Sequence, residues 1–161
     1  MKRVHIVGGK NHGKTTLIVE LVELFRKRGI AVGTIKHTHH FHELDTPGKD
    51  SFRHRQAGAD PAAIFSKETT VVHLAAAGSE QEYARLSSLF ADCQLVLVEG
   101  HLDSQAPKVE VWRQEMETPP VCTSRPGIHA LVTDDPVEGA PLVWRRSELE
   151  SLADRILQLV T

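Results

Sequence analysis

Apolar runs and stretches of helical spacing alternate at the start of the chain, and their order predicts an α/β fold. Residues 4–7 form a short, mostly apolar run that ends at glycines, and residues 15–28 carry apolar side chains at helical spacing. Gly29 ends this predicted helix, and a second apolar run covers residues 30–35. A strand, a helix and a strand in this order form a βαβ unit with a right-handed crossover, so a parallel sheet is expected.

The remaining pattern predicts further strands and helices. Two strands at residues 62–66 and 70–75 flank a turn at Lys67-Glu68, and more strands are expected at 95–98, 109–112 and 130–132. Helices are expected after a cap at Asp50 or Ser51 through about residue 57, from a cap at Ser79 with Leu86, Leu89 and Phe90 on one face, and over residues 147–160. Residues 36–50 are interpreted as a functional loop and 115–126 as a surface excursion. Because neither a repeat nor a linker is visible, one domain over residues 1–161 is expected.

Composition narrows the class of protein. A chain of 161 residues can bury about 70% of its unfolded surface without disulfides, and its cysteines, Cys93 and Cys122, are interpreted as reduced thiols. An early glycine argues against a signal peptide, and since no apolar run has membrane-spanning length, a cytoplasmic location without membrane binding is expected. The net charge is −2 and the basic residues are dispersed, which argues against nucleic-acid binding. Ten histidines are unusual, and five of them lie between His37 and His54.

A phosphate-binding loop joins the first predicted strand to the first predicted helix. Its sequence is Gly8-Gly9-Lys10-Asn11-His12-Gly13-Lys14-Thr15-Thr16. The spacing of Gly8 and Gly13-Lys14-Thr15 matches the P-loop pattern, whose backbone N–H groups and helix amino terminus surround a phosphate. Lys14 is expected to reach the β and γ phosphates and Thr15 to offer its hydroxyl to Mg²⁺, whereas Thr16 is interpreted mainly as a helix-start residue. These nine residues predict a P-loop NTPase-like fold with a mainly parallel sheet flanked by helices.

The ends of the other strands carry further candidates, since ligands of open parallel sheets bind outside the carboxyl ends of the strands. Glu99 follows the apolar strand at residues 95–98, where P-loop proteins usually carry an acidic residue. It can bind Mg²⁺ through water or orient an attacking water, and we therefore assign Lys14 and Glu99 as catalytic residues and Thr15 and Glu99 as metal-side residues. The alternative for Glu99 is a carboxylate that caps the following turn.

The segment from Lys36 to Arg55 is rich in polar chemistry. As a metal site it offers His39, His42 and Asp45, although their spacing matches no known zinc signature. As an anion site it offers cations for phosphate or pterin oxygens, and we favour this hypothesis. The candidate residues of this anion or cofactor loop are Lys36, His37, His39, Asp45, Lys49, Asp50 and Arg53. The alternative is that several of these histidines are solvated loop residues.

The identity of the base is not settled by the residues. The Asn-Lys-x-Asp motif that reads guanine in many GTPases is absent. Asp134, at the end of the predicted strand 130–132, is a candidate base contact, but an Asp-Asp-Pro turn accounts for it equally well.

Taken together, these motifs resemble the molybdopterin-guanine dinucleotide biosynthesis protein B (MobB) family over nearly the whole chain. The resemblance rests on the phosphate loop and on residues 33–40, 47–59, 95–100 and 107–111. It implies a GTP-binding adaptor with weak GTPase activity that assists guanine nucleotide attachment to molybdopterin, with GTP, Mg²⁺ and molybdopterin as ligands. It also implies the molybdenum cofactor guanylyltransferase and molybdoenzyme chaperones as partners. Two departures from the family are Gln94, in place of a usual aspartate, and His101-Leu102, in place of an aromatic residue and a lysine.

Two other functions remain open at this point, and one assembly is expected. A P-loop kinase or ligase would hold an acceptor on the basic loop, and a metal-delivering GTPase is suggested by the histidines, although a cysteine motif is missing. The family resemblance implies a homodimer. The predicted strand near Val71 supports it, because neither face of that strand is clearly polar and both need cover.

Overall fold

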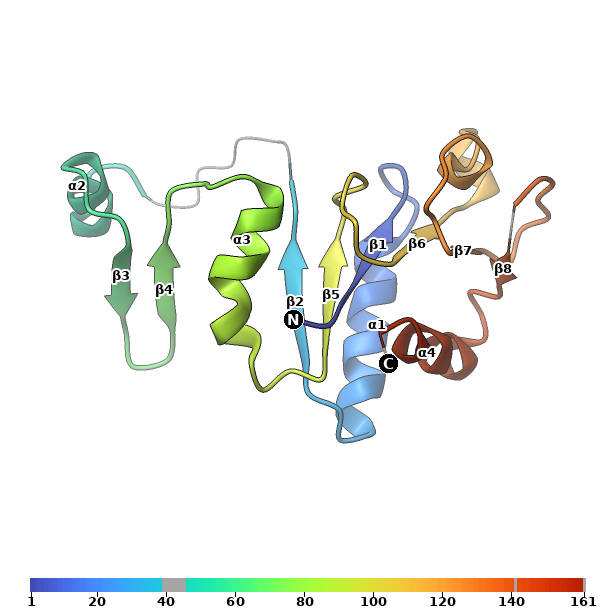
Figure 1. Ribbon diagram of the computed structural model, residues 1–161, viewed down its shortest axis with the longest axis horizontal. Coiled ribbons are helices and arrows are strands. Elements are labelled where there is room, and N and C mark those ends of the chain that lie inside the picture. Colours follow the sequence, from blue (N-terminus) through green and yellow to red (C-terminus); the bar gives the residue numbers. More distant parts are fainter. Residues whose placement is uncertain (39–45, 141, 161) are drawn as a thin grey trace. The chain divides into compact units, whose positions relative to one another are not determined.

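The computed structural model describes residues 1–38, 46–140 and 142–160 of the chain (Figure 1). It separates into two compact units, which we call the sheet unit (Met1–Thr38 and Tyr83–Thr161) and the hairpin unit (His39–Glu82). The single domain expected over residues 1–161 stays a prediction.

A six-stranded sheet forms the centre of the sheet unit, and every neighbouring pair of its strands is parallel. The strand order is β2-β5-β1-β6-β7-β8 (Figure 1). The strands are β1 (Arg3–Val7), β2 (Val32–Lys36), β5 (Leu95–Glu99), β6 (Lys108–Val111), β7 (Ala130–Val132) and β8 (Val143–Trp144). This arrangement confirms the predicted α/β fold with a mainly parallel sheet. The first two strands of the βαβ unit are separated by β5, and the two-residue β8 was not expected.

Both faces of this sheet are covered, because successive side chains of each strand point to opposite sides. On one face Leu95 and Leu97 join a core with the buried residues of α1 (Lys14–Lys27) and α4 (Leu149–Gln158). On the other face Val96 and Val98 pack with Tyr83. Tyr83 belongs to α3 (Ser79–Leu86), which is followed by short 3-10 turns at Ser87–Phe90, Gln114–Met116 and Val121–Thr123. Full burial of Phe25 on α1 contributes about 1.5–3 kcal/mol to this core.

The carboxyl end of α1 is closed by a hydrogen-bonded cap and an ion pair. The Gly29 N–H donates to the Arg26 carbonyl, and the Ile30 N–H donates to the Phe25 carbonyl at 2.9 Å. This is the Schellman arrangement, which satisfies the last carbonyls of a helix and confirms the predicted stop at Gly29. Arg28 pairs with Glu150 and Asp154 of α4 and so fixes the two helices side by side.

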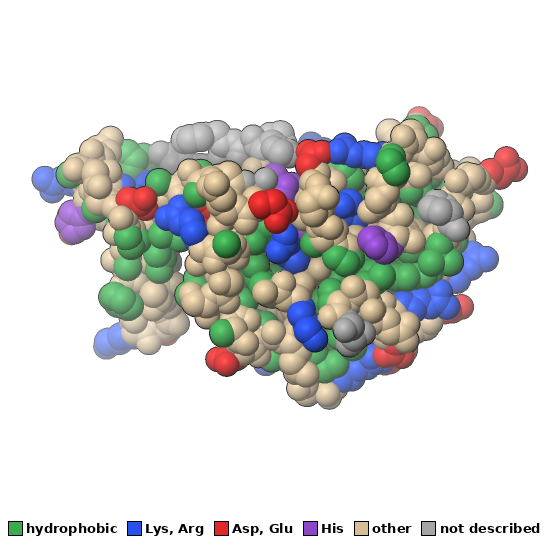
Figure 2. All heavy atoms as spheres, in the orientation of Figure 1, with side chains coloured by type: hydrophobic (Ala, Val, Ile, Leu, Met, Phe, Trp, Pro, Cys, Tyr) green, Lys and Arg blue, Asp and Glu red, His purple; other side chains and the backbone are tan. Residues whose placement is uncertain are grey.

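The hairpin unit contains α2 (Asp50–Gln56), β3 (Ala62–Phe65) and β4 (Thr70–His73), with β3 and β4 antiparallel. The expected strands and turn are confirmed. The N-cap of α2 is Lys49 rather than Asp50 or Ser51, and it makes no side-chain cap hydrogen bond. The hairpin exposes apolar side chains, with 81% of Phe65 accessible to solvent, and Figure 2 shows hydrophobic groups on its surface.

The state of the cysteines and the length of the helices were both predicted from the sequence. Cys93 and Cys122 are free thiols. Burial, together with the Glu110 carboxylate, raises the pKa of Cys122 to about 12, so this thiol stays protonated and unreactive. None of the helices within residues 1–38, 46–140 and 142–160 combines the length and the hydropathy that a membrane crossing needs.

Candidate functional site

The phosphate loop lies between β1 and α1, at the carboxyl end of a central strand. Since β1 sits between β5 and β6, the chain leaves it toward one side of the sheet and later returns to the other. Ligands of open α/β sheets bind at such a reversal of strand order. Gly8 has φ +133°, and a Cβ at this position would stand 2.3 Å from the Val111 carbonyl oxygen. Only glycine therefore lets the loop leave β1 so close to β6.

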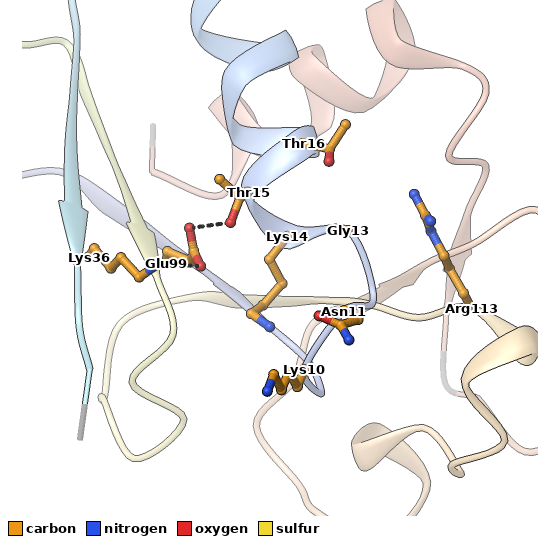
Figure 3. Close-up of a pocket in the computed structure, with 9 residues that line it drawn as sticks. All are labelled: Lys10, Asn11, Gly13, Lys14, Thr15, Thr16, Lys36, Glu99 and Arg113. Carbon is orange, nitrogen blue, oxygen red and sulfur yellow. Dashed lines mark hydrogen bonds and ion pairs between the residues drawn. The ribbon is translucent and has the colours of Figure 1, made fainter. Parts of the chain in front are cut away.

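A cavity of about 420 Å³ opens above this loop (Figure 3). It is lined by Lys10, Asn11, Gly13, Lys14, Thr15, Thr16, Lys36, Glu99 and Arg113. The amino terminus of α1 points its free N–H groups here, because α1 has no side-chain cap. Of the expected loop residues, Gly8, Gly9 and His12 do not line the cavity. Thr16, interpreted from the sequence as a helix-start residue, does.

The carboxylate of Glu99 lies at the edge of the cavity and contacts two expected residues. The Thr15 hydroxyl donates to Glu99 Oε2 at 2.9 Å, and Lys36 Nζ lies 3.6 Å from Oε1 (Figure 3). Lys36 is the direct neighbour of Glu99 across β2 and β5, so strand register brings the pair together. The strand-end rule predicted this grouping, and 15% of the Glu99 side chain is exposed to a ligand.

Lys14 reaches into the cavity from the first residue of α1. Its ammonium group donates to the Gly9 carbonyl oxygen at 2.6 Å, which holds it against the phosphate loop. Burial lowers the pKa of Lys14, the Glu99 carboxylate raises it, and Lys36 lowers it again. An anion in the cavity would replace the water that Lys14 has lost, so the ammonium group is poised for phosphate.

Oxygen donors in the cavity fit a magnesium ion. The Thr15 hydroxyl and the Glu99 carboxylate are hard oxygen ligands, and Mg²⁺ in nucleotide sites takes one or two protein oxygens beside phosphate and water. Among the described residues, no group of three His, Cys, Asp or Glu side chains gathers to hold a metal alone. A metal bound here would therefore depend on phosphate oxygens for part of its coordination.

His12 fastens the phosphate loop to the segment after β6. The Arg113 N–H donates to His12 Nδ1 at 3.0 Å, so Nε2 carries the proton and donates to the Thr118 hydroxyl, also at 3.0 Å. Burial lowers the pKa of His12, with Lys14 and Arg113 adding to the effect and Glu110 opposing it. Its side chain thus supports the loop from behind.

Arg113 lines the cavity but was not identified from the sequence. It follows the predicted strand at 109–112, and the strand-end rule that found Glu99 and Lys36 applies to it equally. Its guanidinium lies over Gly13, where a Cβ would stand 2.9 Å from the nearer Arg113 Nη atom. Arg113 is therefore a fourth cation beside Lys10, Lys14 and Lys36.

Asp134 occupies a turn at the end of β7. Its Oδ1 accepts the Ser147 N–H at 3.1 Å and the Ser147 hydroxyl at 2.9 Å. Desolvation raises the pKa of Asp134, but the hydrogen bonds from Ser147 and Arg146 and the charge of Arg145 together outweigh it and lower this pKa. The structure thus contains the turn-forming role that the sequence left open, while Asp134 also lines a cavity of about 300 Å³ beside the phosphate site.

The residues of the expected anion loop fall in different places. Lys36 lines the phosphate cavity, and His37 packs against His101 below it. Lys49, Asp50 and Arg53 are exposed at the start of α2 in the hairpin unit. The three residues of the metal hypothesis, His39, His42 and Asp45, lie outside the described residues.

Three aromatic rings, those of His37, Tyr83 and His101, stack together in the sheet unit. The His37 and His101 rings are nearly parallel with centroids 4.3 Å apart, and the Tyr83 ring also stacks with His101, with centroids 5.6 Å apart. The Tyr83 hydroxyl lies 2.8 Å from His101 Nδ1. No local pattern in the sequence predicts this contact, because its three members come from three distant segments.

His5 lies edge-on to this stack and is fully buried. Its Nδ1 lies 3.1 Å from the Gly100 carbonyl oxygen, and Arg3 Nε donates to its Nε2 at 3.4 Å, so the ring is held neutral. Burial lowers the pKa of His5 to about 4, with Arg3, His101 and Lys108 adding to the effect and the Gly100 contact opposing it.

We expect His5 to destabilise the protein in acid. The unfolded chain takes up a proton below the ordinary pKa of 6.5, whereas the folded protein does so only near pH 4. The contribution of this ring to the free energy of unfolding is therefore complete above pH 6.5 and is lost between pH 6.5 and 4, by about 3 kcal/mol. The free energy of unfolding, measured with urea at several pH values in this range, should depend less on pH for His5→Gln than for the unchanged protein. An equal dependence in both proteins would contradict the assignment of this acid sensitivity to His5.

Comparison with known proteins shows strong relatives. The family model for molybdopterin guanine dinucleotide synthesis protein B matches residues 3–134. A molybdopterin-guanine dinucleotide biosynthesis adapter protein of Haemophilus influenzae is 33% identical over 94% of this chain and 85% of its own length. The adapter protein of that name in Escherichia coli is 29% identical over 91% and 86%. The crystal structure of Bacillus subtilis MobB has a TM-score of 0.71 at 24% identity, covering 100% of this chain and 99% of that one.

Proposed function

This chain belongs to the molybdopterin guanine dinucleotide synthesis protein B family, and we propose that it works in molybdenum cofactor biosynthesis as an adapter that binds GTP and hydrolyses it slowly. The relatives named as adapter proteins support the role in the pathway. The partner we propose is the guanylyltransferase that attaches the guanine nucleotide to molybdopterin, with molybdoenzyme chaperones as further partners. We place the protein in the cytoplasm.

The observation that carries the nucleotide assignment is the charge of the cavity. Four cations, from Lys10, Lys14, Lys36 and Arg113, line it with one carboxylate, from Glu99. The positive end of the α1 dipole adds to this excess. Such a cluster is stabilised by a polyanion, and a chain of phosphates on a P-loop supplies one.

Several groups of the cavity have proposed roles in binding and hydrolysing the nucleotide. The loop backbone holds the phosphates, and Lys14 exchanges its Gly9 contact for phosphate oxygens. Mg²⁺, when bound beside Thr15 and Glu99, would neutralise charge on the phosphates. Glu99 then orients the attacking water, while the ion pair with Lys36 holds its carboxylate in place. Molybdopterin is proposed as a further ligand, with its phosphate on the exposed cations Lys49 and Arg53.

A nucleotide thermal-shift panel tests this function. GTP and ATP are compared, each with and without Mg²⁺. A ligand at about 100 times its Kd adds about 2.7 kcal/mol to the stability, which raises Tm by about 5–10 °C for a chain of this size. We expect this rise with GTP and Mg²⁺ and a smaller one with ATP. A Tm that no nucleotide changes would remove the proposed function.

The exposed hairpin supports a homodimer. Ile64, Phe65, Val71 and Val72 of β3 and β4 are each at least 38% exposed, and a second copy would remove this apolar surface from water. Light scattering at tens of micromolar protein should give twice the mass of the chain. Phe65→Glu should shift the protein toward monomer, whereas Leu89→Glu, at another exposed apolar site of 68%, should not. A monomer at every concentration would contradict the proposal.

One observation favours a second candidate function, a small-molecule kinase or ligase. A largely apolar cavity of about 460 Å³ lies between α1 and β2 and shares Thr15, Lys36 and Glu99 with the phosphate cavity. An acceptor bound there would lie beside the terminal phosphate. Release of nucleoside diphosphate that depends on an added acceptor would favour this function over the adapter, and release without one favours slow hydrolysis.

A further inference from the structure

Arg113 faces Glu99 and Lys36 from the other side of the phosphate loop (Figure 3). Its guanidinium packs over Gly13, the residue that begins α1. A guanidinium at the positive end of a helix is unfavourable by itself, and Lys14 lies next along the chain. An anion placed between them relieves this repulsion.

The backbone of Arg113 is fixed to the fold on both sides. Its N–H donates to His12 Nδ1 at 3.0 Å, and the preceding Trp112 N–H donates to the Val132 carbonyl at 3.1 Å. The Trp112 ring N–H donates to the Thr118 carbonyl at 2.7 Å and closes the segment that follows. Because the Cα is held, the reach of the guanidinium is set by side-chain rotamers alone.

The partner of the guanidinium is a weak one. Arg113 Nη1 lies 3.3 Å from Glu115 Oε1, and the side chains are 43% and 67% exposed. Ion pairs between exposed side chains contribute about 0–1 kcal/mol. A phosphate carries more charge and takes two parallel N–H bonds from a guanidinium, so it displaces the Glu115 carboxylate readily.

Arg113 also forms a wall shared by two cavities. Besides the phosphate cavity, it lines the cavity of about 300 Å³ at the carboxyl ends of β6 and β7. The other residues of that cavity are Val111, Trp112, Glu115, Thr133, Asp134, Asp135 and Arg146. A nucleotide can place its terminal phosphates on the loop and its nucleoside in the second cavity. In that position, the phosphate attached to the sugar lies beside Arg113.

We propose that Arg113 binds the phosphate nearest the nucleoside and leaves Glu115 when it does so. The proposal rests on the proposed nucleotide-binding function and adds to it a residue outside the P-loop motif. Under this proposal the Glu115 carboxylate competes with the nucleotide for the Arg113 guanidinium. Arg113 binds either the carboxylate or the phosphate, and not both at once.

Titration with GTP and with GDP tests the contact. Arg113→Ala should lower the affinities for GTP and for GDP by the same factor, about tenfold or more. Both nucleotides carry the phosphate next to the nucleoside, and the lost hydrogen bond is charge-assisted. Arg113→Lys keeps the charge but loses the two parallel N–H groups of the guanidinium, so its affinities should lie between those of Arg113→Ala and the unchanged protein. Arg26→Ala removes the same charge from an exposed site near the other end of α1 and should change neither affinity.

The exchange is tested by Glu115→Gln. This change should raise GTP affinity by about twofold to fivefold, since it removes the competing carboxylate. In an Arg113→Ala background the same change should have no effect. A structural role of this segment would instead lower affinity in both backgrounds.

The outcomes separate the two proposals. If the unchanged protein binds GTP and Lys14→Ala weakens it, but folded Arg113→Ala and Arg113→Lys bind GTP and GDP as the unchanged protein does, the role of Arg113 is overturned and the nucleotide site stands. If the unchanged protein binds neither nucleotide, the proposed function itself fails and the role of Arg113 fails with it.

Discussion

Glu99→Gln is expected to slow single-turnover GTP hydrolysis by about 10²-fold or more while GTP affinity changes little. The carboxylate lies at the end of β5 within 2.9 Å of the Thr15 hydroxyl, beside the position where a metal and an attacking water would stand. Its negative charge contributes more in the transition state than in the ground state, so its loss appears in the rate rather than in binding.

The same variant separates this role from a structural one. Glutamine keeps the size of the side chain and an oxygen that accepts the Thr15 hydroxyl, so Tm should remain close to that of the unchanged protein. Glu138→Gln, at an exposed position between β7 and β8, is the matched control and should leave hydrolysis unchanged. Hydrolysis and melting are measured on one preparation. Unchanged hydrolysis with a lowered Tm would remove Glu99 from the active site and assign it to the turn.

Lys14→Ala is expected to abolish measurable GTP binding in a folded protein. The variant loses a charge-assisted phosphate contact of about 1.5–3 kcal/mol, so affinity should fall at least about tenfold. The fold should survive because the Lys14 side chain makes its contact with one loop carbonyl, that of Gly9, and alanine suits the first turn of α1.

Isothermal titration together with circular dichroism measures this effect. Lys27→Ala, at the exposed last residue of the same helix, removes an equal charge and serves as the control. An intact circular dichroism spectrum with GTP binding at the affinity of the unchanged protein would disprove the assignment of the loop.

Much of the site could be predicted because its residues obey local rules. The P-loop is contiguous in sequence, and Glu99 and Lys36 follow apolar strands whose carboxyl ends meet at one sheet edge. The βαβ start and the Gly29 helix end were likewise local. In each case the residues that allow the prediction are neighbours in sequence of the element that they form.

The remaining features depend on contacts that no short window contains. His12 supports the loop through Thr118, a residue 106 positions away, and the insertion of β5 between β1 and β2 follows from strand order over the whole chain. The two residues of β8, which include Trp144, are too few to show a period. Arg113 follows β6, so it falls under the same strand-end rule as Glu99 and Lys36.

The ring stack has a consequence for how the chain is connected. The chain leaves the sheet unit after Thr38 and returns at Tyr83, and the His101 ring contacts the rings of both His37 and Tyr83. The hairpin unit is therefore an insertion into the sequence of the sheet unit, and the rings of His37 and Tyr83, which flank it, both contact His101. Domains tolerate insertions at surface connections of this kind, because the host domain folds without the inserted segment.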